Sequence, residues 1–140
     1  MTPEQIRLIE ESWKSVDELG DAAIQAFYST LFSKAPQARA MFPDDMVEQR
    51  RKLKQALALA VANLRRLDEL GPKLAELGAR HVDYGTKPEH YPVVGEALLD
   101  TLASAFGEAW SAELADAWGA AFTLISQVMI DGAARRVSAA

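Results

Sequence analysis

Apolar residues recur at intervals of three or four along almost the whole chain, which is the repeat of an amphipathic α-helix. A clear example lies near the N-terminus, where one stripe contains Ile6, Ile9, Trp13 and Val16. No segment alternates apolar and polar residues between two turns, as a half-buried strand does. The pattern therefore predicts an all-α protein, and 140 residues suit one domain that spans residues 1–140.

Glycine, proline and capping residues divide this pattern into separate helices. Thr2, followed by Pro3 and then Gln5, has the form of a capped helix start, and Gly20 ends that helix. Asp44 or Asp45 is expected to cap a long helix after a short turn-like segment. We expect the other helices at about 21–34, 46–67, 91–107 and 111–136, with a shorter one that restarts at Gly71-Pro72 and ends at Gly85 and Pro88.

The composition excludes several classes of function. The chain carries 15 Lys+Arg against 20 Asp+Glu, a net charge of −5, whereas a nucleic-acid binder needs a basic surface. It has no cysteine, which excludes disulfides, thiolate nucleophiles and cysteine-bound zinc. Its eight glycines are never closer than seven residues, so no glycine-rich phosphate loop can be formed.

Membrane and export signals are also not expected. The longest apolar run, residues 56–62, is much shorter than the roughly 20 residues that span a bilayer. The N-terminal segment is amphipathic and carries several acidic residues, unlike a signal peptide. We therefore expect a cytoplasmic protein with neither a membrane nor a nucleic acid as its partner.

His81 lies on the apolar stripe of the predicted shorter helix. It follows Leu70, Leu74 and Leu77 at helical spacing, so the imidazole shares their face. Two interpretations remain open: a core histidine bonded to the backbone, or the single protein ligand of a metal cofactor that supplies its own remaining ligands. His90 lies beyond the end of this helix, which excludes a zinc-binding histidine pair on one helix face.

Two more polar residues lie on apolar stripes. Tyr28 is four residues after Ile24, and Gln49 is four residues before Leu53. Each polar group costs roughly 1–3 kcal/mol if it is buried without a partner. Singly, Tyr28 fits the edge of a core and Gln49 the surface of a first helical turn. Together with His81, they predict a pocket whose ligand satisfies three polar groups from three helices.

A basic cluster follows Gln49. It consists of Arg50, Arg51, Lys52 and Lys54. Such a run is typical of a solvated helix face. The alternative is that one of these cations pairs with an anionic group at the mouth of the pocket.

Several segments, in this order along the chain, resemble globins. They are IEESWKSV, FYSTLFSKAPQARAMF, QRRKLKQALALAV, LGARH, HYPVVGEALL and DAWGAAF. The likeness covers essentially all 140 residues and is greatest to bacterial single-domain haemoglobins and to the haem domain of flavohaemoglobins. It implies the globin fold, with helices packed around a haem pocket, and haem b (iron protoporphyrin IX) as the cofactor.

The resemblance also implies a role for each candidate residue. His81 matches the proximal histidine that binds the haem iron, and Tyr28 and Gln49 match the distal pair that contacts the gas ligand. The other implied haem contacts are Phe42 on the porphyrin, Leu53 in the ligand site, Val94 at the haem edge and Lys52 at a propionate, with Arg51 or His90 as alternatives.

Two positions depart from the flavohaemoglobin pattern. Where those proteins carry a tyrosine and a glutamate in the last helix, this chain has Phe122 and Ala133, although Tyr91 of the proximal network is retained. A carboxylate partner would make the proximal imidazole a stronger electron donor. Its replacement by alanine argues against peroxidase-like chemistry.

The implied function is tight, reversible binding of dioxygen, as in oxygen transport, with nitric oxide and carbon monoxide as further ligands. Nitric oxide dioxygenation (nitric oxide detoxification) is an implied enzymatic use, for which a separate reductase would have to supply electrons. One alternative is a haem-based gas sensor or ligand-sequestering module that signals through a separate partner. A haem-free bundle of globin shape is another.

Overall fold

The computed structural model describes residues 1–83 and 89–139, and within them every regular element is helical. The α-helices are α1 (Pro3–Leu19), α2 (Asp21–Lys34), α3 (Val47–Ala62), α4 (Leu67–Asp83), α5 (His90–Phe106) and α6 (Ala112–Ala139). Three short 3-10 helices connect them: η1 (Pro36–Met41), η2 (Leu64–Arg66) and η3 (Gly107–Ala109). The predicted all-α class is confirmed.

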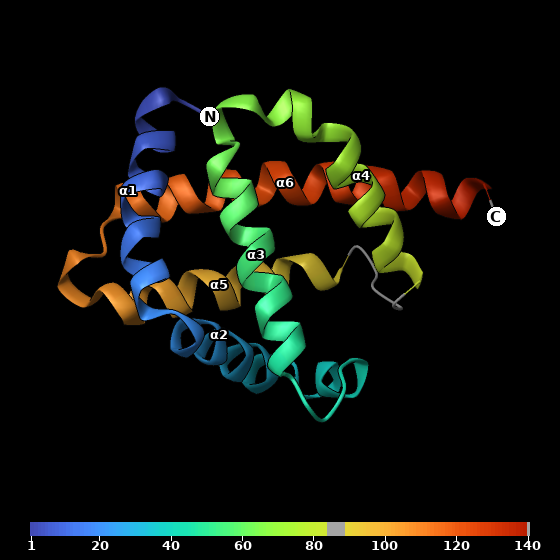
Figure 1. The fold of residues 1–140 in the computed structure, drawn as a ribbon, viewed down its shortest axis with the longest axis horizontal. Coiled ribbons are helices and arrows are strands. Elements are labelled where there is room, and N and C mark those ends of the chain that lie inside the picture. Colours follow the sequence, from blue (N-terminus) through green and yellow to red (C-terminus); the bar gives the residue numbers. More distant parts are fainter. Residues whose placement is uncertain (84–88, 140) are drawn as a thin grey trace.

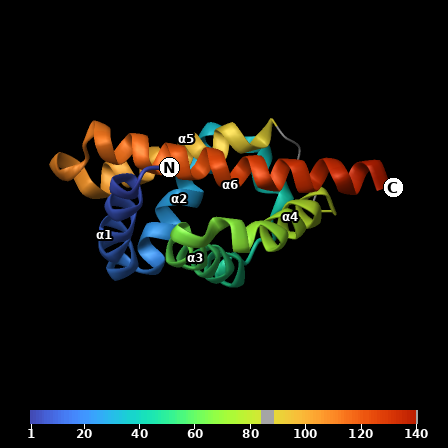
Figure 2. The same ribbon diagram turned by 90° about the horizontal axis from the view of Figure 1, so that it is seen from above.

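The helices form two crossing layers. α5 and α6 run alongside each other, and α1, α3 and α4 lie over one face of that pair (Figure 1). The view from above separates the two layers and places α4 against the C-terminal half of α6 (Figure 2). No helix in the described ranges is both long and apolar enough to cross a membrane.

The first helix starts and ends as the sequence predicts. The Thr2 hydroxyl accepts a hydrogen bond from the Gln5 backbone N–H, and the Gln5 side chain accepts one from the Thr2 N–H. This reciprocal capping box satisfies two N–H groups that have no partner within the helix. Gly20 adopts a positive φ of 60°, which lets the chain turn directly from α1 into α2.

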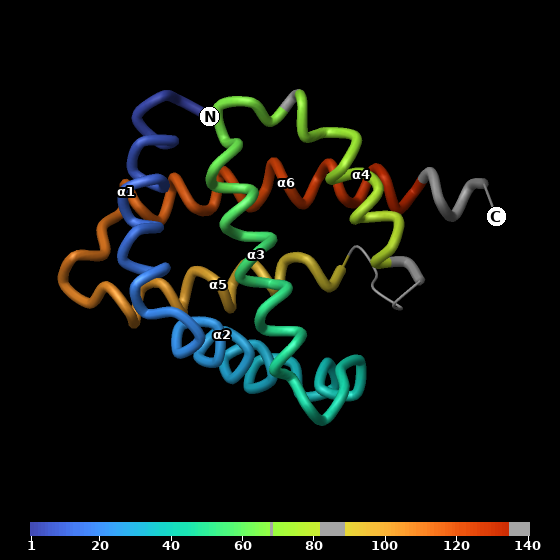
Figure 3. The backbone as a smooth tube through the Cα atoms, in the orientation of Figure 1, coloured from blue at the N-terminus to red at the C-terminus, as the bar shows by residue number. Residues whose placement is uncertain are grey.

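Two predicted helix boundaries are wrong. The third helix ends at Ala62, where the side-chain N–H of Asn63 donates to the Leu59 carbonyl and η2 follows. The backbone tube shows the chain turning between α3 and α4 (Figure 3). The next helix does not restart at Gly71-Pro72 but runs continuously from Leu67, with Pro72 inside it. The buried Leu70 and Leu74 flank this proline, and we infer that their burial offsets the hydrogen bond that proline cannot donate. The predicted end at Gly85 and Pro88 lies outside the described residues.

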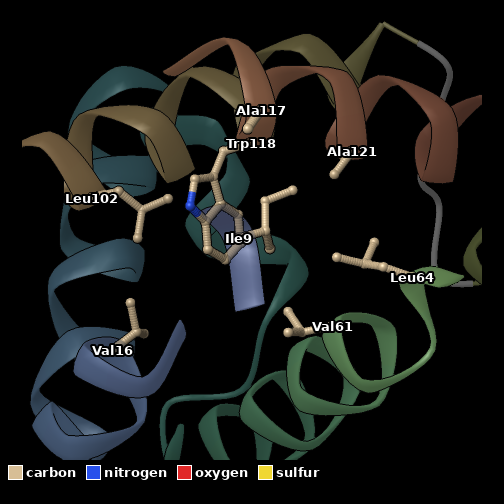
Figure 4. Packing of buried hydrophobic residues seen from close by; sticks show 8 residues of the cluster. All are labelled: Ile9, Val16, Val61, Leu64, Leu102, Ala117, Trp118 and Ala121. Carbon is tan, nitrogen blue, oxygen red and sulfur yellow. The ribbon is translucent and has the colours of Figure 1, made fainter. Parts of the chain in front are cut away.

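The larger of two buried clusters in the described residues joins α1, α3, η2, α5 and α6. Its members are Ile9, Val16, Val61, Leu64, Leu102, Ala117, Trp118 and Ala121 (Figure 4). Trp118 donates its indole N–H to the Ser12 hydroxyl over 3.0 Å, and that hydroxyl donates to the Leu8 carbonyl over 2.7 Å. Buried polar groups of α1 and α6 thus satisfy one another, and this core fixes the frame on which the second cluster is built.

Candidate functional site

A second buried cluster brings together four residues predicted for the site. Its buried members are Ile24, Phe27, Tyr28, Leu31, Met46 and Ala97, and its partly buried members are Phe32, Phe42, Leu53, Leu57, Val93, Val94 and Leu98. Tyr28, Phe42, Leu53 and Val94 therefore meet here, although they come from four separate segments of the chain. Apolar side chains surround the single phenol in this cluster.

Gln49 reaches the same cluster through a hydrogen bond. Its side-chain amide nitrogen donates to the phenol oxygen of Tyr28 over 3.2 Å, which links α3 to α2. Tyr28 is only 6% exposed, and Gln49 is half-buried. Burial raises the pKa of the Tyr28 phenol above its ordinary value, and the bond from Gln49 opposes this shift only in part. Tyr28 is therefore held in its protonated form, with an O–H able to donate.

Aromatic rings pack around this phenol in edge-to-face geometry. The ring of Tyr28 lies 5.6 Å from that of Phe42 and 5.1 Å from that of Phe27, at 71° in each case. Such arrangements are worth about 0.5–1.5 kcal/mol beyond the area that they bury. They restrict the tilt of the Tyr28 ring and so fix the direction of its hydroxyl.

Arg39, which the sequence analysis did not select, holds the segment that carries Phe42. Its guanidinium donates to the backbone carbonyls of Phe42, Pro43 and Asp44 over 3.0–3.2 Å. The same guanidinium lies 5.4 Å from the centre of the Phe32 ring, within the range of a cation–π contact. Arg39 thereby ties the end of η1 to the aromatic cluster. A single arginine in a short connecting segment gives no sequence signal for this role.

Ion pairs account for most of the basic cluster on α3. Arg50 pairs with Asp21 over 2.8 Å, Arg51 pairs with Glu48, and Lys54 pairs with Asp17 over 3.2 Å. The hydrogen bond from Arg50 lowers the pKa of Asp21 below its ordinary value. Because Arg50 and Asp21 join the start of α3 to the start of α2, they also hold Gln49 close to Tyr28.

The side chain of Lys52 is exposed, and its predicted contact with a propionate remains a prediction.

His81 lies near the end of α4, which packs mainly against α6. Its ring is half-buried, and Nδ1 lies 2.7 Å from the backbone carbonyl oxygen of Leu77. A carbonyl only accepts, so in the neutral ring Nδ1 carries the proton and Nε2 carries the lone pair. This geometry agrees with both interpretations of the histidine, because metal-binding histidines commonly donate the N–H of their other ring nitrogen to a backbone carbonyl.

Tyr91 carries a buried phenol oxygen that has no hydrogen-bond partner among the described residues. The residue is 8% exposed, and burial raises the pKa of its phenol. One turn further along α5, a Cβ added at Gly95 would lie 2.7 Å from the ring of Phe122. α5 therefore presents a buried O–H, unsatisfied among the described residues, beside a tightly packed aromatic contact with α6.

The donor chemistry of the site is sparse. Among the side chains that the structure describes, no three His, Asp or Glu residues gather as a metal-binding group. A haem iron needs only one or two protein ligands, since the porphyrin supplies four nitrogens.

A helical protein with an apolar cluster, one phenol–amide pair and one tautomer-fixed histidine matches the class of globin-fold proteins. The family model described as Globin matches residues 25–129, and the chain belongs to this family.

Similar proteins agree with the assignment. An uncharacterized globin-like protein of Aquifex aeolicus is 30% identical over 130 residues, covering 93% of this chain and 92% of that protein. A flavohemoprotein of Pseudomonas aeruginosa is 31% identical over 131 residues, and the chain spans about a third of such flavohemoproteins. The solved structure of a bacterial globin from Campylobacter jejuni superposes with a TM-score of 0.86 at 26% identity, covering 98% of this chain and 99% of that one.

Proposed function

We propose that this chain binds haem b through His81 and that the loaded protein binds dioxygen reversibly and tightly. The observation that carries the proposal is the Gln49–Tyr28 hydrogen bond, which places a protonated phenol among apolar side chains. A buried phenol held in this way is suited to donate a hydrogen bond to a small ligand. Membership of the globin family supports haem as the group beside it.

The residues present fit a haem. His81 would bind the iron through Nε2, because its Nδ1 proton is engaged by the Leu77 carbonyl. Phe42 and Val94 would supply apolar contacts, as members of one cluster with Tyr28. The buried Tyr91 hydroxyl, unsatisfied within the described residues, also indicates that a polar partner belongs near the start of α5. Lys52 is proposed at a propionate because its side chain is exposed and cationic.

When bound, haem would supply a metal that can take up one small diatomic molecule. The chain contributes a hydrogen-bond donor of fixed direction. The Tyr28 oxygen accepts from Gln49, so the hydroxyl hydrogen of Tyr28 is available to the ligand. A hydrogen bond to a charged acceptor is worth roughly 1.5–3 kcal/mol. That free energy corresponds to roughly 10- to 150-fold slower release. Leu53 and Phe42 exclude water from the phenol and preserve this effect.

We propose that the surroundings of His81 favour reversible binding of the gas over its chemical activation. The Nδ1 proton of His81 goes to a neutral carbonyl oxygen, which polarises the ring less than a carboxylate would. Ala133, at the position where we expect the glutamate of flavohaemoglobins, supplies no carboxylate. We therefore propose reversible binding, with nitric oxide and carbon monoxide as competing ligands.

Nitric oxide dioxygenation is the second candidate. The similarity to flavohemoproteins over about a third of their length favours it. Conversion of nitric oxide and dioxygen to nitrate consumes one electron per turnover, so the reaction needs an electron donor, and we propose a reductase in that role. Addition of nitric oxide to the oxygenated protein, with nitrate measured with and without a reductase, separates single turnover from catalysis.

Oxygen release measured by stopped flow tests the proposal. Tyr28→Phe removes only the hydroxyl, and we expect release to become roughly 10- to 150-fold faster. Phe32→Leu is the matched control, because it alters the packing beside Tyr28 and leaves the phenol in place. An unchanged rate in Tyr28→Phe, or an equal acceleration in both variants, would contradict the proposed donor.

A further inference from the structure

Two glycines let the backbones of α4 and α6 touch. A Cβ added at Gly78 would lie 2.0 Å from the carbonyl oxygen of Met129, and one added at Gly132 would lie 2.1 Å from the carbonyl oxygen of Ala75. Both glycines are buried. Every other residue type carries a Cβ, so only glycine permits this approach. The ribbon shows α4 lying directly against α6 at this end of the molecule (Figure 2).

The two contacts are reciprocal. Each helix presents one glycine to a backbone carbonyl of the other, and the two contacts lie three residues apart on both helices. Because the order of the contacts is reversed between α4 and α6, a slide of one helix along the other would break both. The crossing therefore has one permitted register and one permitted separation.

His81 follows Gly78 by three residues on the same helix, slightly less than one turn. The carbonyl that holds its ring belongs to Leu77, which is adjacent to the crossing. A Cβ at position 78 would lie 2.0 Å from the carbonyl oxygen of Met129, whereas an ordinary contact is about 3.4 Å. The two backbones would therefore have to separate by about 1.4 Å. A metal–imidazole bond is only about 2 Å long. A displacement of this size in the helix is therefore large relative to the bond.

We propose that Gly78 and Gly132 are positioning residues for His81. They set the depth of α4 on α6, and through it the length and tilt of the bond between the imidazole and the haem iron. This inference rests on the proposed function, since it requires that His81 bind haem. It adds that the strength of that bond is determined by a backbone contact between two helices.

Resonance Raman spectroscopy of the ferrous, ligand-free haem protein measures this bond through its iron–histidine stretching band. In Gly78→Ala and Gly132→Ala we expect the band to shift to lower frequency or to be lost. Gly71→Ala on α4 and Gly119→Ala on α6 are matched controls, because an added Cβ meets no atom within 4 Å at either position. Both controls should retain the wild-type band.

A second arm separates positioning from a general disturbance of the fold. His81→Gly with free imidazole places an untethered ligand on the iron. Its iron–imidazole band should be the same with or without Gly78→Ala. Persistence of the shift with free imidazole would overturn the positioning role, as would an unchanged band in a folded Gly78→Ala protein.

The remaining outcomes are also decisive. If neither Gly78→Ala nor Gly132→Ala has the circular dichroism of a folded helical protein, while both controls do, then the crossing is required for folding and the positioning role is rejected. A wild-type protein with no iron–histidine band would overturn the proposed function itself. That result differs from a normal wild-type band left unchanged by Gly78→Ala, which overturns only this inference.

Discussion

The side-chain nitrogen of Gln49 donates to the phenol oxygen of Tyr28 across 3.2 Å, and this bond joins α3 to α2. The direction of donation assigns different tasks to the two residues. We propose that Tyr28 retains a hydrogen for a ligand, whereas Gln49 orients the phenol. In this proposal Gln49 acts on the ligand through Tyr28.

Mutation of both residues should give non-additive kinetics. Gln49→Leu alone should accelerate oxygen release by less than Tyr28→Phe does, because the phenol remains. In the Tyr28→Phe background the same change should have little further effect, since its target is gone. Stopped-flow rates of the four proteins give the coupling, with Gln55→Leu on the exposed face of α3 as the control. Additive effects would show that Gln49 contacts the ligand independently.

Stability should fall at alkaline pH. Burial raises the pKa values of Tyr28 and Tyr91. Above the ordinary tyrosine pKa of about 10, the unfolded chain loses protons that the folded chain keeps. The free energy of unfolding then decreases as pH rises, because the folded state binds more protons. Urea titrations of the haem-free protein from pH 7 to 11 measure this, and Tyr28→Phe or Tyr91→Phe should each reduce the decrease. If the decrease in both variants were the same as in wild type, the assignment would be contradicted.

The buried Tyr91 hydroxyl should destabilise the haem-free protein. Its oxygen has no partner among the described residues, and an unsatisfied buried group costs about 1–3 kcal/mol. Tyr91→Phe should therefore raise the free energy of unfolding by up to that amount. If haem or a group ordered by it bonds the phenol, the gain should disappear in the loaded protein. A loss of stability in the haem-free variant would show that the hydroxyl already has a partner.

The hydrogen bond between Trp118 and Ser12 should contribute to global stability. Ser12→Ala leaves the buried indole N–H without its acceptor, which costs about 1–3 kcal/mol. Ser104→Ala, at an exposed position of α5, is the matched control and should change stability by less than about 0.5 kcal/mol. Thermal or urea unfolding measures both variants. Equal changes in the free energy of unfolding for the two variants would show that this hydrogen bond does not stabilise the fold.

Local signals in the sequence predicted most helix boundaries correctly. The Thr2 capping box and the Gly20 turn depend only on neighbouring residues, so short-range chemistry determines them. The end of α3 was not predicted, because apolar periodicity continues past Asn63 while the bond from its side chain to Leu59 ends the helix. Pro72 gave the opposite error, because it predicted a helix start where α4 is continuous. We infer that burial of its neighbours keeps the helix intact.

The candidate site was predictable where polar residues interrupt apolar stripes. Tyr28 and Gln49 were selected on that basis, and the structure joins them by a hydrogen bond. Arg39 and the Gly78–Gly132 crossing were not selected. Their roles depend on backbone carbonyls and on helix approach in three dimensions, which one-dimensional spacing does not encode.

The proposed bond between His81 and haem iron is tested most directly by absorption spectra of purified protein supplied with haem. Wild type and His90→Ala should show the same Soret band of a histidine-bound haem, and His81→Ala should lose or shift it. Addition of imidazole to His81→Gly should restore the wild-type band. A wild-type protein that folds but takes up no haem, or a His81→Ala spectrum identical to wild type, would contradict the assignment.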